Sequence, residues 1–101
     1  MLMKTIQIKT FGEFLVGREE GQQAYDIFKR DYADKYPEET FLCDFTGVKI
    51  VAPSYVDEVF GRLQETYPNK FIIADNIPHA FRVAFDTVAE TKNLTFMYGK
   101  D

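Results

Sequence analysis

The first third of the chain has two patterns of apolar and polar positions, one typical of a strand and one typical of a helix. Met3–Thr10 (MKTIQIKT) is rich in β-branched residues, which predicts a strand. Arg18–Tyr32 follows with apolar residues three and four positions apart, which places one apolar stripe on a helix. Gly17, with Glu20 three residues further on, resembles a weak capping start for that helix. Pro37, in the turn YPEE, prevents the helix from continuing.

The middle of the chain repeats this order of strand and helix. Thr40–Phe45 (TFLCDF) is a nearly continuous apolar run of strand length, which is typical of a strand covered on both faces. A second amphipathic helix is predicted from Ser54 to the residue before Pro68. Its single apolar stripe consists of Val56, Val59, Phe60, Leu63 and Tyr67.

The last third predicts one more strand, a third helix and an edge strand. Lys70–Asp75 (KFIIAD) is a short buried strand, and Asn76 with Pro78 supplies the start signals of a helix. The apolar stripe of that helix consists of Phe81, Ala84, Phe85 and Val88. The segment LTFMYG, residues 94–99, is expected to form an edge strand.

This alternation predicts an α/β fold, with a mainly parallel central sheet of about four strands flanked by three helices. The 101 residues are expected to form a single domain, 1–101, large enough to fold without disulfides or metal. The composition, 46% apolar and 28% charged, agrees with an ordinary globular core.

Charge and cysteine content narrow the classes of partner and the compartment. The net charge of -4 would on average repel phosphate backbones and anionic membranes, so we expect neither nucleic acid nor membrane as a partner. Cys43 lies inside an apolar run and is expected to be a buried thiol in a reducing compartment. The N-terminal MLMKTIQIKT lacks the continuous apolar stretch of a signal peptide, which favours a cytoplasmic location.

Motifs that hold cofactors or metals are missing from the sequence. It contains neither G-x-G-x-x-G after the first strand nor G-x-x-x-x-G-K-[ST], so no dinucleotide or phosphate cradle is predicted. One histidine and one cysteine cannot form the usual zinc sites, and the acidic residues are not spaced for calcium. We therefore expect no cofactor and no metal.

Three residues remain as candidates for chemistry. Ser54 and His79 both precede helices at the strand carboxyl edge, where a nucleophile and a base could meet. No G-x-S-x-G motif supports this pair, and a histidine in the first turn of a helix is usually a solvated group. Asp44 either contributes a functional carboxylate at the same edge or accepts N–H groups of the following turn, and we favour the turn. A small enzyme or ligand-binding domain that uses these three residues is the alternative hypothesis.

Ser54 also has a simpler interpretation as a helix cap. As N-cap it would accept a hydrogen bond from the N–H of Val56 or Asp57, and Asp57 would complete a capping box. A phosphoryl group on Ser54 would be favoured by the helix dipole but repelled by Asp57 and Glu58. We favour the cap, although the two roles do not exclude one another.

Two segments resemble a known family. FGEFLVGREEGQQAYDIF and LCDFTGVKIVAPSYVDEVFGRL resemble the STAS-like domain family of uncharacterised function, whose pattern is an SRE helix start, a DF-x-G-V strand end and an S-[FY]-x-D-E helix start. The resemblance covers about Phe11–Glu90, and Gly17 stands where the family usually has serine. The matches to the second and third elements are Asp44, Phe45, Gly47, Val48, Ser54, Tyr55, Asp57 and Glu58.

More distantly, DFTGVKIVAPSYVDEV is similar to the signature of true STAS domains, the anti-sigma factor antagonists. In those proteins a serine at the position of Ser54 is phosphorylated by a serine kinase of the GHKL ATPase type, which switches partner binding. The resemblance implies a non-enzymatic regulatory domain that docks a kinase-like ATPase through the loop 47–53 and the start of the second helix. The residues implied in docking or regulation are Ser54, Tyr55, Asp57, Glu58, Asp44 and Gly47.

Overall fold

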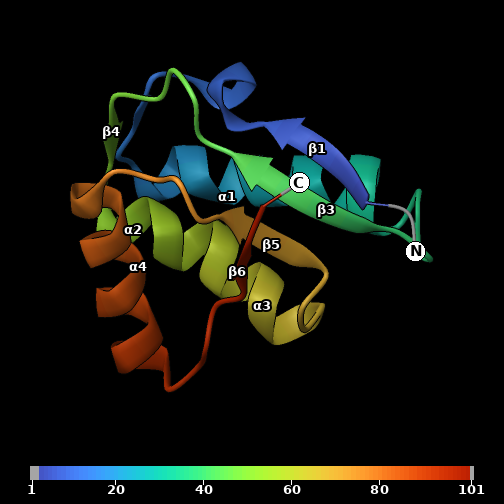
Figure 1. Ribbon diagram of the computed structural model, residues 1–101. Coiled ribbons are helices and arrows are strands. Elements are labelled where there is room, and N and C mark those ends of the chain that lie inside the picture. The colour runs from blue at the N-terminus through green and yellow to red at the C-terminus, as the bar shows by residue number, and fades with distance from the viewer. Residues whose placement is uncertain (1–2, 101) are drawn as a thin grey trace.

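The computed structural model of the chain describes residues 3–100 (Figure 1). Its strands are β1 (Met3–Gln7), β2 (Phe14–Leu15), β3 (Thr40–Asp44), β4 (Ile50–Val51), β5 (Phe71–Ala74) and β6 (Tyr98–Gly99). A short 3-10 turn, Ile8–Phe11, follows β1. The predicted strands are therefore present, with ends that differ by a few residues from those read off the sequence.

The helical segments form three continuous helices, as the sequence pattern predicts. The first is α1 (Arg18–Phe28), which continues as a π-helical turn, Lys29–Ala33. The second consists of α2 (Pro53–Val56), a π-helical turn (Asp57–Gly61) and α3 (Arg62–Thr66). The third is α4 (His79–Lys92).

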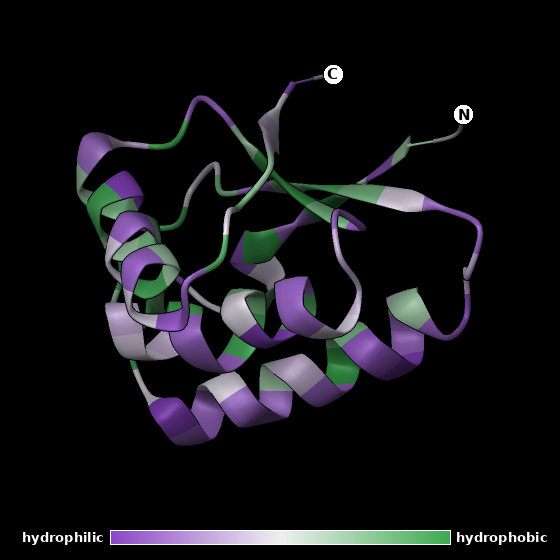
Figure 2. Cartoon of the chain, turned by 90° about the horizontal axis from the view of Figure 1, so that it is seen from below, coloured by the Kyte–Doolittle hydropathy of each residue, from purple (hydrophilic) through white to green (hydrophobic). Residues whose placement is uncertain are grey.

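The main sheet has the strand order β1-β3-β5-β6, and every neighbouring pair is parallel. Each connection thus moves one strand further across the sheet in the same direction. Because such crossovers are right-handed, a sheet built in this order carries its helices on one face. Figure 2 shows the helical ribbons gathered on one side of the sheet and none over the other side, which we call the helix-free face. The predicted mainly parallel α/β fold is confirmed.

Aromatic side chains fill the core between the sheet and the helices. Phe28, Phe41, Phe60 and Phe85 are among the largest fully buried side chains. The rings of Phe85 and Phe96 meet edge to face with 5.0 Å between their centroids, a favourable geometry for aromatic pairs. Cys43 has no exposed surface, and its burial raises the pKa of the thiol far above the ordinary value. Its expected role as a small buried hydrophobe is confirmed.

The structure differs from the sequence-based expectation at three short strands, β2, β4 and β6. The final strand contains only Tyr98–Gly99, because residues 94–97 reach the sheet as irregular chain. A second, two-stranded parallel sheet made of β2 and β4 was not predicted at all. No helix among residues 3–100 combines the length and the apolar character that crossing a bilayer requires.

Candidate docking surface at the start of the second helix

The turn after β3 holds two of the predicted site residues. The Asp44 Oδ1 atom accepts hydrogen bonds from the Thr46 hydroxyl at 2.7 Å and the Thr46 N–H at 3.0 Å. These two bonds lower the pKa of the Asp44 carboxyl below its ordinary value. Gly47 has φ +87°, in the region that favours glycine. The favoured interpretation of Asp44 as a turn acceptor is confirmed, and the DF-x-G-V pattern encodes a tight turn.

This turn leads into the small parallel sheet of β2 and β4. Phe14 is paired with Ile50, and Leu15 with Val51. Leu15 and Val51 point into the core and are 1% and 7% exposed. Phe14, Val16 and Ile50 point to solvent and are 59%, 50% and 47% exposed. We call these three side chains the apolar patch.

Charged groups border the apolar patch on one side. The Glu13 carboxylate lies 3.6 Å from the Lys9 ammonium and 3.5 Å from the Lys49 ammonium. All three side chains are substantially exposed, so the pairs themselves add little stability. The border carries two positive charges and one negative charge, whereas the whole chain has a net charge of -4.

Ser54 does not cap the second helix, contrary to the sequence-based prediction. The N-cap is Ala52, whose carbonyl oxygen accepts the N–H groups of Tyr55 and Val56, each at 3.1 Å. Pro53 occupies the first helical position, where its fixed φ suits the helix and its missing N–H costs nothing. Ser54 therefore lies inside the first turn. Its hydroxyl donates a 2.8 Å hydrogen bond to the Val16 carbonyl oxygen, which ties the helix start to the apolar patch.

The predicted capping box at Asp57 is also wrong. The Asp57 carboxylate accepts a 2.8 Å bond from the Arg18 guanidinium and lies 3.1 Å from the Lys92 ammonium. Arg18 also donates to Glu58 at 3.0 Å. The bond from Arg18, and to a lesser degree Lys92, lowers the pKa of Asp57 below its ordinary value. The acidic pair of the S-[FY]-x-D-E pattern therefore joins the second helix to the start of α1 and to the end of α4.

Tyr55 lies in the core and not on the surface. Its side chain is 2% exposed, and burial raises the pKa of the phenol to about 12. Gly21 allows α1 to pack close to this part of the second helix, because a Cβ at Gly21 would lie 2.9 Å from the Glu58 Cβ. Of the residues implied by the resemblance, Tyr55, Asp57 and Glu58 thus build the helix packing, and Ser54 remains at the surface beside the patch.

A shallow hollow of about 160 Å³ adjoins Ser54. Its lining includes Arg18, Pro53 and Ser54, together with Thr87 and Thr91 of α4. The hollow is therefore lined from α1, α2 and α4, and it adjoins the start of α2 at the end of the loop 47–53. We refer to the apolar patch, the loop 47–53 and Ser54 as the docking surface.

The three candidates for chemistry do not meet in one site. Ser54 and Asp44 line different hollows, and His79 is exposed at the start of α4. No hydrogen bond joins any two of these side chains among residues 3–100. Within the same residues, no group of three His, Cys, Asp or Glu side chains could hold a metal ion.

Phe14 and Val16 were not among the site residues predicted from the sequence. One signal for the patch was available, because the run FLV is apolar at odd and even positions alike. Such a run is typical of a strand with both faces covered, whereas β2 has only one face covered.

A family model described as a STAS-like domain of unknown function matches residues 20–77, more than half of the 101 residues. The matched segment contains β3, the turn at Gly47, β4 and the whole second helix. No curated protein and no solved structure matches the chain significantly.

Proposed function

Because this chain belongs to the family of STAS-like domains of unknown function, we propose that it is a non-enzymatic regulatory module that binds another protein. The proposed contact is the docking surface, and the proposed class of partner is a GHKL-type kinase-like ATPase. The class of partner rests on the resemblance to anti-sigma factor antagonists.

One observation supports docking most directly: the apolar patch is a strand face that is exposed to solvent. Phe14 and Ile50 are paired across two strands, and both are about half exposed or more, at 59% and 47%. Exposed apolar groups that gather on one strand face mark protein interaction sites more often than scattered ones do. Aromatic residues are also frequent among the side chains that dominate binding energy. Phe14 is therefore the proposed anchor of the contact.

Ser54 is the proposed position of a switch. Its hydroxyl proton is donated to the Val16 carbonyl, and Val16 belongs to the patch. A phosphoryl group on Ser54 would replace that proton, so the bond that ties the helix start to the patch would be lost. The added charge would also stand in the hollow lined by Arg18 and Asp57, where it would be attracted by one and repelled by the other.

Site-specific photo-crosslinking in the native host tests the proposed contact. A benzophenone side chain at position 14 should crosslink to one protein, whereas the same group at Val83 should not. Val83 is a matched control because it is 49% exposed and lies on α4, outside the docking surface. The partner that the crosslink identifies should then be purified by itself. It should bind the Phe14→Ser variant at least about tenfold more weakly than wild type, a difference of about 1.4 kcal/mol. Equal crosslinking from both positions, or unchanged affinity, would refute the contact.

Intact mass of the protein from its native host tests the switch separately. A phosphoryl mass increase that maps to Ser54 is the expected result. An unmodified protein whose Ser54→Glu variant binds the partner like wild type would exclude Ser54 from regulation.

A further inference from the structure

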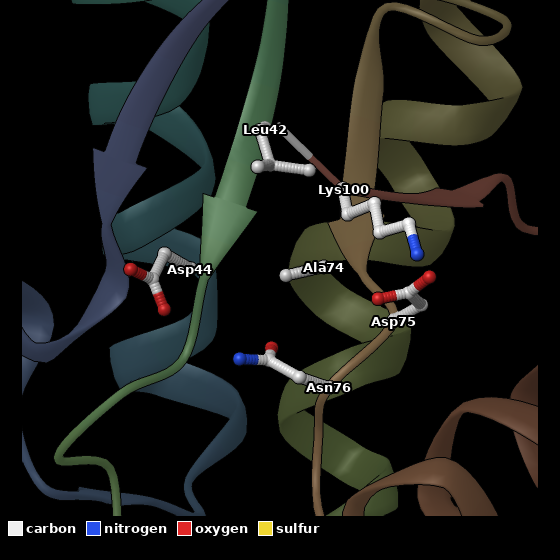
Figure 3. A pocket seen from close by; sticks show the side chains of 6 residues that line it. All are labelled: Leu42, Asp44, Ala74, Asp75, Asn76 and Lys100. Carbon is white, nitrogen blue, oxygen red and sulfur yellow. The ribbon is translucent and has the colours of Figure 1, made fainter.

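The helix-free face of the main sheet contains a hollow of about 340 Å³ at the carboxyl ends of its strands (Figure 3). It is lined by Leu42, Asp44, Ala74, Asp75, Asn76 and Lys100. Asp44 comes from the end of β3, and Ala74 is paired with Gly99 of β6. Ala74 contributes only a methyl group to the lining, which leaves space that a larger side chain would fill. None of its lining residues belongs to the docking surface.

The floor of the hollow is apolar although it faces away from the core. Leu42 and Ala74 are 3% and 6% exposed, yet neither belongs to the hydrophobic cluster between sheet and helices. No helix covers this face, so neighbouring side chains cover most of the surface of Leu42 and Ala74. The hollow lies outside the carboxyl ends of β3 and β5.

The charges around the floor favour a cation. In Figure 3 the Asp75 carboxylate and the Lys100 ammonium lie on one side and point toward each other. Asp44 lies on the other side, and its lowered pKa keeps it ionised at neutral pH. Both bonds from Thr46 go to Oδ1, and hydrogen bonding from the Gln7 side chain on the neighbouring strand β1 also lowers the pKa of the Asp44 carboxyl. Two carboxylates and one ammonium leave one net negative charge.

We propose that this hollow binds a small organic cation, namely a primary ammonium on a compact apolar body. The apolar body would lie on Leu42 and Ala74, and the ammonium would donate to Asp44 and to the amide oxygen of Asn76. The volume is at the small end of the range for ligand pockets, which excludes long chains. The net negative charge disfavours phosphates and nucleotides.

The test is a titration of the isotope-labelled protein with phenethylamine, followed by NMR of the backbone amides. Phenethyl alcohol and phenylpropionate are the neutral and anionic controls of similar shape. Phenethylamine should shift the amides at the ends of β3, β5 and β6, and it should bind at least about tenfold more tightly than the alcohol. Equal binding of the amine and the alcohol, or shifts spread over the whole surface, would overturn the proposal.

Two variants and one control locate the binding. Asp44→Asn keeps an oxygen for the Thr46 bonds but removes the charge, so it should abolish the preference for the amine. Ala74→Leu should fill the hollow and abolish binding of all three probes. Asp86→Asn removes one charge from an exposed position on α4, 67% accessible at the side chain, and should leave the preference intact. Loss of the preference in Asp86→Asn, or its retention in either of the other two, would show that the hollow is not the site.

Discussion

Gly21 lies where α1 packs against the second helix. Its replacement by alanine has two effects on stability that act in opposite directions. Alanine is favoured over glycine inside a helix by about 1 kcal/mol, so helix propensity alone predicts a more stable protein. However, the new Cβ would lie 2.9 Å from the Glu58 Cβ. Carbon atoms pack best at about 3.5–4.0 Å. Because the Glu58 Cβ is attached directly to the backbone, a change of rotamer cannot move it away.

The second helix would therefore have to shift, and its bonds to Arg18 and Val16 would be strained. Forcing an extra methyl group into a packed interior costs about 1–3 kcal/mol. Subtraction of the propensity gain leaves an expected net loss of about 1 kcal/mol for Gly21→Ala, with about 2 kcal/mol as the upper value. In a chain of this size a loss of about 1 kcal/mol lowers the Tm by about 4–8 °C.

Urea unfolding measures this difference, and Gln22→Ala is the matched control because Gln22 is the next residue of α1 and is exposed. The control should change the free energy of unfolding by less than about 0.5 kcal/mol. A Gly21→Ala variant that is about 1 kcal/mol more stable than wild type would refute the close packing and leave propensity as the only effect.

Three further predictions concern residues around the same core. Lys70→Met should lower the free energy of unfolding by about 2 kcal/mol, because the Lys70 ammonium donates to three carbonyl oxygens at 2.6–3.1 Å, whereas Lys35→Met should have almost no effect in the same urea titration. Gly47→Ala should cost about 1–2 kcal/mol, measured by thermal unfolding, because φ +87° strains any residue with a Cβ; an unchanged Tm would show that the turn adapts. Asp57 has a lowered pKa in the folded state, so its contribution is present above the ordinary value of 3.8 and is lost as the pH falls through the folded value. Asp57→Asn should therefore flatten the loss of stability as the pH falls below 3.8, and an unchanged slope would contradict its pairing.

The sequence was sufficient for the main sheet because its strands and helices have strong periodic patterns. Thr40–Phe45 and Lys70–Asp75 are apolar runs of strand length, and the helices between them have single stripes. The family pattern added the turn at Gly47, whose form depends on a few adjacent residues. Local signals of this kind can be read without knowledge of the rest of the fold.

Other features depend on pairs of residues far apart in the chain. β2 and β4 contain two residues each, which is too short for a period, and their pairing joins positions about 36 apart. The cap at Ser54 was predicted because serine is a favoured N-cap, but Pro53 takes the first helical position and moves the cap to Ala52. The hydroxyl then finds Val16, a partner that no local pattern indicates. The sequence therefore indicated the loop 47–53 and Ser54 but not the apolar patch.

The order of the main sheet has a consequence for how the protein is made. Because β1, β3, β5 and β6 lie side by side in the order of synthesis, each new strand adds to the edge formed by the strand before it. No strand has to insert between two that have already paired. Each strand–helix–strand unit can thus dock as it leaves the ribosome, and the growing edge of the sheet is unpaired only until the next strand arrives. Sheets whose central strands are synthesised last have no such sequential route, since their early strands must wait unpaired for a distant part of the chain.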